Sequence, residues 1–168
     1  APLSPRMFSG EPIEDDVFEV QASILTADLM AYEALGSLGV EADVVTGHSF
    51  GDYAALVAAG GWTLEDALQA TVARAEAIEA NVQPGAMASV IASAQRVDEV
   101  LKTLGAVGVI ETSNINAPEQ TVISGEPAAL EAACKAFAGE GIETRRLPIP
   151  RAFHSSLMAA ARERLQDS

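Results

Sequence analysis

A Gly-x-Ser-x-Gly pentapeptide, from Gly47 to Gly51, is the feature that most constrains how this chain folds. The β-branched run 44–46 precedes it, and an alanine-rich stretch with helical spacing follows it. A strand, a tight turn and a helix in that order form a nucleophile elbow, which exposes the central serine. Glycines on both sides allow the chain to close around a strained central residue. The pattern predicts that Ser49 is a nucleophile in an α/β domain; an ordinary glycine-rich turn is the alternative.

Composition limits the partners of such a serine. The chain has 168 residues, 49% of them apolar, and a formal charge of −14, so nucleic acid and anionic membrane surfaces are not expected as partners. The single cysteine, Cys134, excludes an internal disulfide and is typical of a reducing compartment. The sequence shows no basic-then-apolar leader and no apolar run long enough to span a membrane. We therefore expect a cytoplasmic protein without a metal site.

Periodicity divides the first half of the chain into helices and one strand. Residues 1–16 contain three prolines and no periodic pattern, so an irregular arm is expected there. A helix is predicted over 17–38, a strand over 40–46, and helices over about 51–59 and 63–81. The first of these helices is expected to turn one apolar stripe inward, formed by Val20, Ile24, Ala27, Ala31, Leu35 and Leu38.

The second half of the chain changes character. Its pattern is β-α-β-β-α-β, the split βαβ order of ferredoxin-like modules, followed by a helix over about 156–166. The expected fold class is therefore α/β. Residues 1–84 and 148–168 would form a partial α/β-hydrolase-like subdomain, and residues 85–147 would form an inserted ferredoxin-like (βαββαβ) subdomain.

Of the two histidines, only His154 suits the role of catalytic base. His48 lies inside the elbow, and the side chain at that position points away from the cleft in most such turns. A neutral imidazole at His154 would take the proton of Ser49, and the N–H of Phe50 would donate to the oxyanion. No carboxylate of the sequence fits the third position of a triad. Either a backbone carbonyl orients the imidazole, as in a dyad, or the acid lies outside this sequence; a histidine that merely caps a helix is the alternative.

Arg74 lies on an apolar helix face without a local acidic partner. Its neighbours three and four positions away are Ala70, Thr71, Ala77 and Ile78. An unpaired buried guanidinium is costly, so this side chain must find an anion elsewhere. Spacing alone does not separate a distant carboxylate of the protein from a ligand.

The stretch 47–56, which begins Gly-His-Ser-Phe-Gly-Asp, resembles the active-site segment of malonyl-CoA:acyl-carrier-protein transacylases and of polyketide synthase acyltransferase domains. Asp52 replaces the Glu of the family pattern. Three further blocks match the family in the right order, at 21–23, 114–125 and 152–155. The resemblance covers residues 17–164, and the inserted ferredoxin-like module is a trait of the same family.

This resemblance implies acyl transfer by double displacement. Ser49 would carry the acyl group and His154 would be its base, in a reaction that moves malonyl from malonyl-CoA to the phosphopantetheine thiol of an acyl carrier protein in polyketide biosynthesis. Coenzyme A enters only as the thioester substrate, and no tightly bound cofactor is expected. Arg74 would bind the malonyl carboxylate, and Phe153 would favour malonyl over methylmalonyl. The implied substrate-binding set is Arg74, Phe50, Phe153, His48 and Asn114.

The chain departs from the family pattern in places. Ala75 and Glu76 follow Arg74 where the family has Gly and Arg, and Arg151 stands where many malonyl-selective domains have His. The family's Gly-Gln-Gly loop, which supplies a second oxyanion donor, is not found. The sequence therefore resembles a partial acyltransferase domain with carrier and neighbouring synthase domains as partners, loosely similar to iterative enediyne-type synthases. A serine esterase or lipid acyl hydrolase, or an inactive carrier-docking fragment, is the alternative.

Overall fold

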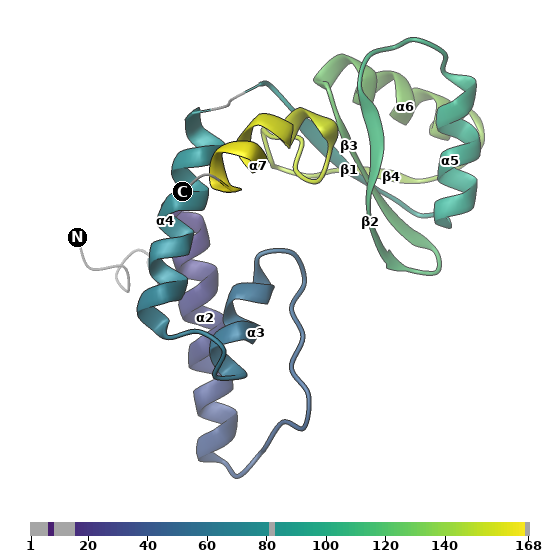
Figure 1. Ribbon diagram of the computed structural model, residues 1–168. Coiled ribbons are helices and arrows are strands. Elements are labelled where there is room, and N and C mark those ends of the chain that lie inside the picture. The colour runs from purple at the N-terminus through teal and green to yellow at the C-terminus, as the bar shows by residue number, and fades with distance from the viewer. Residues whose placement is uncertain (1–6, 9–15, 81–82, 167–168) are drawn as a thin grey trace. The chain divides into compact units, whose positions relative to one another are not determined.

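The computed structural model describes residues 7–8, 16–80 and 83–166 (Figure 1). The chain divides into two compact units, and the boundary falls between Glu79 and Ala80. Most of the arm predicted over 1–16 lies outside the described residues. None of the described helices has the length and apolar character needed to cross a membrane.

The first unit is described as an assembly of three helices. These are α2 (Val17–Ser37), α3 (Gly51–Ala58) and α4 (Leu64–Ala80). A reciprocal capping box starts α4: the N–H of Asp66 donates to Thr63 Oγ1 at 3.1 Å, and the N–H of Thr63 donates to Asp66 Oδ2 at 2.9 Å. At the start of α2, the carboxylate of Asp16 accepts from the N–H of Glu19 at 2.8 Å. The three predicted helices are confirmed.

The strand predicted over 40–46 is not formed. All strands in the described part of the chain lie between Ala86 and Arg146. Val44 is 84% exposed and Val40 is 54% exposed, so neither packs in a sheet. A strand needs a neighbour to satisfy its N–H and C=O groups. The described residues of the first unit provide only helices, so the β-branched run stays without a ladder.

α2 buries a face different from the predicted one. Every residue of the predicted inward stripe is exposed, up to 79% at Leu38: Val20, Ile24, Ala27, Ala31, Leu35 and Leu38. The buried residues are Val17, Gln21, Ala22, Ser23 and Leu25. Leu25 packs with Phe50, Ala54 and Ala67 in the core of this unit. The apolar spacing located a stripe, but the contacts of α2 with α3 decide which face is covered.

The second unit is built on an antiparallel sheet with strand order β2-β3-β1-β4 (Figure 1). Its elements are β1 (Ala86–Val90), α5 (Ala94–Thr103), β2 (Ile110–Ala117), β3 (Gln120–Gly125), α6 (Pro127–Gly139), β4 (Thr144–Arg146), η1 (Ser156–Met158) and α7 (Ala159–Gln166). The strands and helices of 86–146 therefore follow the predicted β-α-β-β-α-β order. Residues 148–166 group with this unit.

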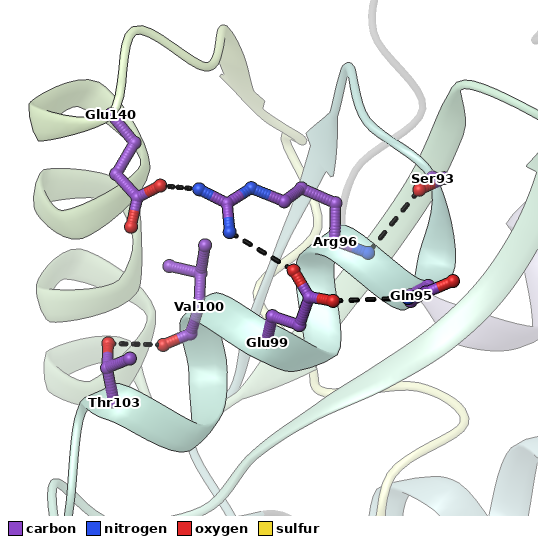
Figure 2. Close-up of polar contacts among 7 residues, drawn as sticks. All are labelled: Ser93, Gln95, Arg96, Glu99, Val100, Thr103 and Glu140. Atoms are coloured by element: carbon purple, nitrogen blue, oxygen red, sulfur yellow. Dashed lines mark hydrogen bonds and ion pairs between the residues drawn. The ribbon is translucent and has the colours of Figure 1, made fainter.

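Helices α5 and α6 cover one face of the sheet, because both contribute to a single apolar core with β1. That core contains Ala86, Ala88, Val90, Val97, Val100, Ile123, Leu130, Ala133 and Phe137. Outside the core, Arg96 of α5 bonds both Glu99 on its own helix and Glu140 after α6, while Ser93 caps α5 (Figure 2). The charged side chains are 37–49% exposed, so the bridges contribute little to stability beside the core.

Candidate active site

Ser49 has the strained backbone that an elbow serine requires. Its φ is 54°, in the left-handed region, which costs a non-glycine residue about 1–3 kcal/mol. The turn is closed by two bonds: the N–H of Gly51 donates to the carbonyl of His48 at 3.0 Å, and the N–H of Asp52 donates to that of Ser49 at 3.2 Å. A Cβ at Gly47 would collide with the backbone of Gly51 and Asp52. The chain thus makes a tight turn directly into α3.

The two glycines of the pentapeptide differ in their importance. A Cβ at Gly51 would have only Asp28 Oδ2 nearby, at 3.9 Å, which is an ordinary contact. Only Gly47 is required by close approach, contrary to the expectation that both flanking glycines are needed.

Phe50 contributes its backbone N–H next to the serine. Among the described residues this N–H has no backbone acceptor, as is usual where a helix begins and the first N–H groups lack partners. The N-terminus of α3 also carries the positive end of the helix dipole. The N–H of Phe50 is therefore available to an oxyanion formed at Ser49.

The guanidinium of Arg74 lies over the ring of Phe50. The Cζ atom of Arg74, on α4, lies 5.4 Å from the ring centroid, which is cation–π geometry. Phe50 also packs against Tyr53 at 4.7 Å, and Tyr53 meets Trp62 edge-on at 5.4 Å between centroids. Burial raises the pKa of Tyr53, and the positive charge of Arg74 offsets part of that rise. No spacing pattern in the sequence predicts this aromatic group.

Arg74 has no ion-pair partner among the described residues. The ion pairs of that part of the chain join Arg96 and Lys135 to carboxylates of the second unit. Burial lowers the pKa of Arg74, although an arginine stays charged at neutral pH. Residues 1–79 contain fourteen acidic residues and only two basic ones, Arg6 and Arg74. In an acidic unit, a partly buried, unpaired cation beside the elbow indicates a site for an anion.

His154 lies in the second unit and has the same unusual backbone as Ser49. Its φ is 60°, and these two are the non-glycine residues with positive φ in the described part of the chain. Strain of this kind is concentrated at functional sites. Beside it, Ala152 is buried and Phe153 is partly buried. Asn114 lies on β2, opposite Val122 of β3.

The structure brings together Ser49, Phe50 and Arg74 within the first unit. Phe153, His154 and Asn114 lie in the second unit. A joint site made of both groups stays a prediction. Sequence reasoning missed two contacts, the stack of Arg74 on Phe50 and the hydrogen bond from Ser156 to the carboxylate of Glu111, because neither has a spacing signature.

The sequence matches the acyl transferase domain model over residues 9–168. The chain therefore belongs to the acyl transferase domain family. It is 33% identical over 172 residues to the malonyl CoA-acyl carrier protein transacylase of Bacillus subtilis (strain 168). The matched region covers 98% of this chain and 54% of that protein.

Solved structures of the family share the mixed α/β fold. The chain is similar to the acyl-carrier-protein S-malonyltransferase from Burkholderia pseudomallei 1710b, with a TM-score of 0.88, 34% identity, and coverage of 98% of this chain and 56% of that one. It is also similar to the acyltransferase domain of the iterative polyketide synthase in enediyne biosynthesis, with a TM-score of 0.80, 31% identity, and coverage of 93% and 41%. The chain thus spans about half the length of the Bacillus transacylase, 2% of the polyketide synthase GfsA of Streptomyces halstedii and 8% of the spectinabilin polyketide synthase system protein NorA of Streptomyces orinoci.

Proposed function

We propose that this chain carries the nucleophile and carboxylate-binding residues of an acyltransferase that moves malonyl from malonyl-CoA to the phosphopantetheine thiol of an acyl carrier protein. The observation that carries the proposal is the guanidinium of Arg74, which has no ion-pair partner in the described part of the chain and is stacked on the residue that follows Ser49. Malonyl ends in a free carboxylate, which the planar guanidinium fork binds with two parallel hydrogen bonds. The names of the related transacylases support the same pair of substrates.

The first half-reaction loads the serine. The imidazole of His154 takes the proton of the Ser49 hydroxyl as Oγ attacks the thioester carbonyl. The N–H of Phe50 donates to the oxyanion of the tetrahedral intermediate. Collapse breaks the carbon–sulfur bond, and the departing coenzyme A thiolate takes the proton from the imidazolium. The products are malonyl-Ser49 and free coenzyme A.

The second half-reaction is the reverse with a different thiol. The carrier's phosphopantetheine thiol gives its proton to His154 and attacks the malonyl ester. The oxyanion again forms at the N–H of Phe50, and Ser49 leaves with the proton. A Ser-His dyad suffices for this scheme, with no metal or tightly bound cofactor in any step.

The remaining substrate contacts belong to the same proposal. The bulk of Phe153 would discourage an α-methyl group, a preference worth only about 1–3 kcal/mol. His48 and Asn114 complete the substrate-binding set. In the whole protein, residues 1–84 and 148–168 would belong to an α/β-hydrolase-like subdomain with the ferredoxin-like 85–147 inserted. The carrier protein, neighbouring synthase domains and a cytoplasmic location are part of this proposal.

A serine esterase or lipid acyl hydrolase is the second candidate, because it could use the same elbow. It would need an apolar acyl pocket, and the charge of Arg74 beside the elbow does not fit one. Hydrolysis of p-nitrophenyl esters without any malonyl adduct would favour it. A fragment that only docks a carrier would give neither product.

Mass spectrometry of the intact enzyme after incubation with malonyl-CoA tests the proposal. The wild-type enzyme should gain one malonyl group, and Ser49→Ala should gain none. Arg74→Ala should slow malonyl loading at least tenfold, since hydrogen bonds to charged groups contribute about 1.5–3 kcal/mol. Acetyl loading from acetyl-CoA should hold or rise in the same variant. An equal loss of both acyl groups would remove Arg74 from the carboxylate role.

A further inference from the structure

The carboxylate of Glu111 binds the residue two positions after His154. Its Oε2 accepts from the backbone N–H of Ser156 at 2.8 Å, and its Oε1 accepts from the hydroxyl of Ser156 at 2.7 Å. Glu111 lies on β2, where it is paired with Ser124 of β3. Two charge-assisted bonds therefore fasten the chain after His154 to a strand that lies 45 residues earlier.

The other end of the same loop is also fixed. Ala152 is 1% exposed, and a Cβ on Gly85 would collide with its backbone nitrogen. The hydroxyl of Ser155 then donates to the carbonyl of Ala152 at 2.7 Å, so the bond spans His154. His154 is thus held between an anchored residue before it and an anchored residue after it.

Glu111 also supplies a hydrogen-bond acceptor that the start of η1 lacks. Ser155 is the N-cap of η1, and its side chain makes no capping hydrogen bond. The first N–H groups of a helical turn need acceptors from outside it. Glu111 supplies that acceptor to Ser156, which leaves the hydroxyl of Ser155 for the bond to Ala152. One carboxylate therefore fixes both the start of η1 and the loop that leads to it.

We propose that Glu111 is a positioning residue for His154. By fastening Ser156, it keeps residues 152–156 in the one conformation that holds His154 at φ 60° and presents its imidazole in a single orientation. A left-handed non-glycine backbone persists only where the surroundings over-determine it. The inference depends on the proposed function, since it assumes that His154 is the base.

The test uses Glu111→Gln in the intact enzyme, with Glu119→Gln as the matched control. Glu119 is exposed in the turn between β2 and β3. A glutamine at 111 keeps the shape but presents an amide donor to one of the two donors of Ser156. We expect malonyl loading of Ser49 at saturating malonyl-CoA to slow about tenfold, because small misplacements of catalytic groups are costly. The half-saturating concentration and the control should stay unchanged.

The double variant Glu111→Gln/His154→Ala separates positioning from other effects. If Glu111 acts through His154, the glutamine should slow loading no further once the imidazole is absent. Ser156→Ala, which removes only the hydroxyl bond, should give a smaller loss and covers the case in which Glu111→Gln does not fold. Normal loading by folded Glu111→Gln, or an equal loss in the His154→Ala background, would overturn the inference. Normal loading by His154→Ala alone would instead overturn the proposed base.

Discussion

Substituting Phe50 by leucine should separate malonyl from acetyl transfer. Leucine keeps an apolar side chain and the backbone N–H that we propose as the oxyanion donor, but it removes the ring above which Arg74 Cζ lies, 5.4 Å from the centroid. A cation–π contact contributes about 0.5–1 kcal/mol at exposed sites and about 2 kcal/mol when desolvated. Arg74 is partly buried, so the intermediate figure of about 1 kcal/mol applies, which corresponds to a roughly fivefold change in rate.

The assay compares the two acyl groups in one enzyme. Ser49 loading is measured by mass spectrometry at limiting malonyl-CoA and acetyl-CoA, for wild type, Phe50→Leu and Phe50→Tyr. Malonyl loading should fall about fivefold in the leucine variant while acetyl loading stays within twofold, and tyrosine should restore the malonyl rate. An equal fall for both acyl groups would show that the ring serves the elbow and not the guanidinium. So would a further loss of malonyl loading when Phe50→Leu is added to Arg74→Ala.

Two further predictions concern the stability of the first unit. Gly47→Ala should destabilise the folded protein by about 1–3 kcal/mol through overpacking, whereas Gly51→Ala, whose Cβ meets only an ordinary contact, should be within about 0.5 kcal/mol of wild type. Thermal unfolding of both variants measures the difference, and equal losses would refute it. Hydrogen bonds from Thr63 lower the pKa of Asp66, so its contribution to stability is present above the unfolded pKa and is lost as the pH falls through the lower folded value. Asp66→Asn should therefore flatten the acid limb of the stability curve below about pH 4, and an unchanged slope would contradict this assignment.

The second unit could be predicted from the sequence because its elements find their partners within it. Residues 86–146 contain all the described strands, and the core joins β1 to α5 and α6. Local preference agrees with these contacts at Pro127, which lies in the first turn of α6, as its fixed φ favours. The sequence therefore sufficed to predict the helices and strands wherever local preference and tertiary contacts agree.

Two predictions from sequence patterns fail in the first unit. The run 40–46 has strand composition, and α2 has a clear apolar stripe, yet the described residues supply no cover for either. A periodic pattern indicates which residues prefer burial. Whether they are buried depends on another element that packs against them, and the pattern does not identify that element. The predicted strand and the predicted inward face were wrong for this reason.

The residues of the candidate site could be selected from the sequence, but the contacts that support them could not. Ser49 and His154 were selected by motif and by elimination, and both have strained backbones. Arg74 was selected because none of its neighbours three or four positions away is acidic. The stack on Phe50 depends on side-chain torsions, and the bond from Ser156 to Glu111 joins distant positions. Neither contact can be predicted from the spacing of residues in a single sequence.

The uneven distribution of charge has a kinetic consequence. Coenzyme A thioesters carry phosphates, and the unit that holds Ser49 has fourteen acidic residues against two basic ones. For the coenzyme A thioester of the proposed function, diffusional encounter would therefore work against a repulsive field, which dissolved salt screens over roughly 10 Å at 0.1 M. An anion would offset this repulsion at close range only if it has a carboxylate that reaches the guanidinium of Arg74. The same repulsion that slows encounter would thus keep other anions of the cell out of the elbow.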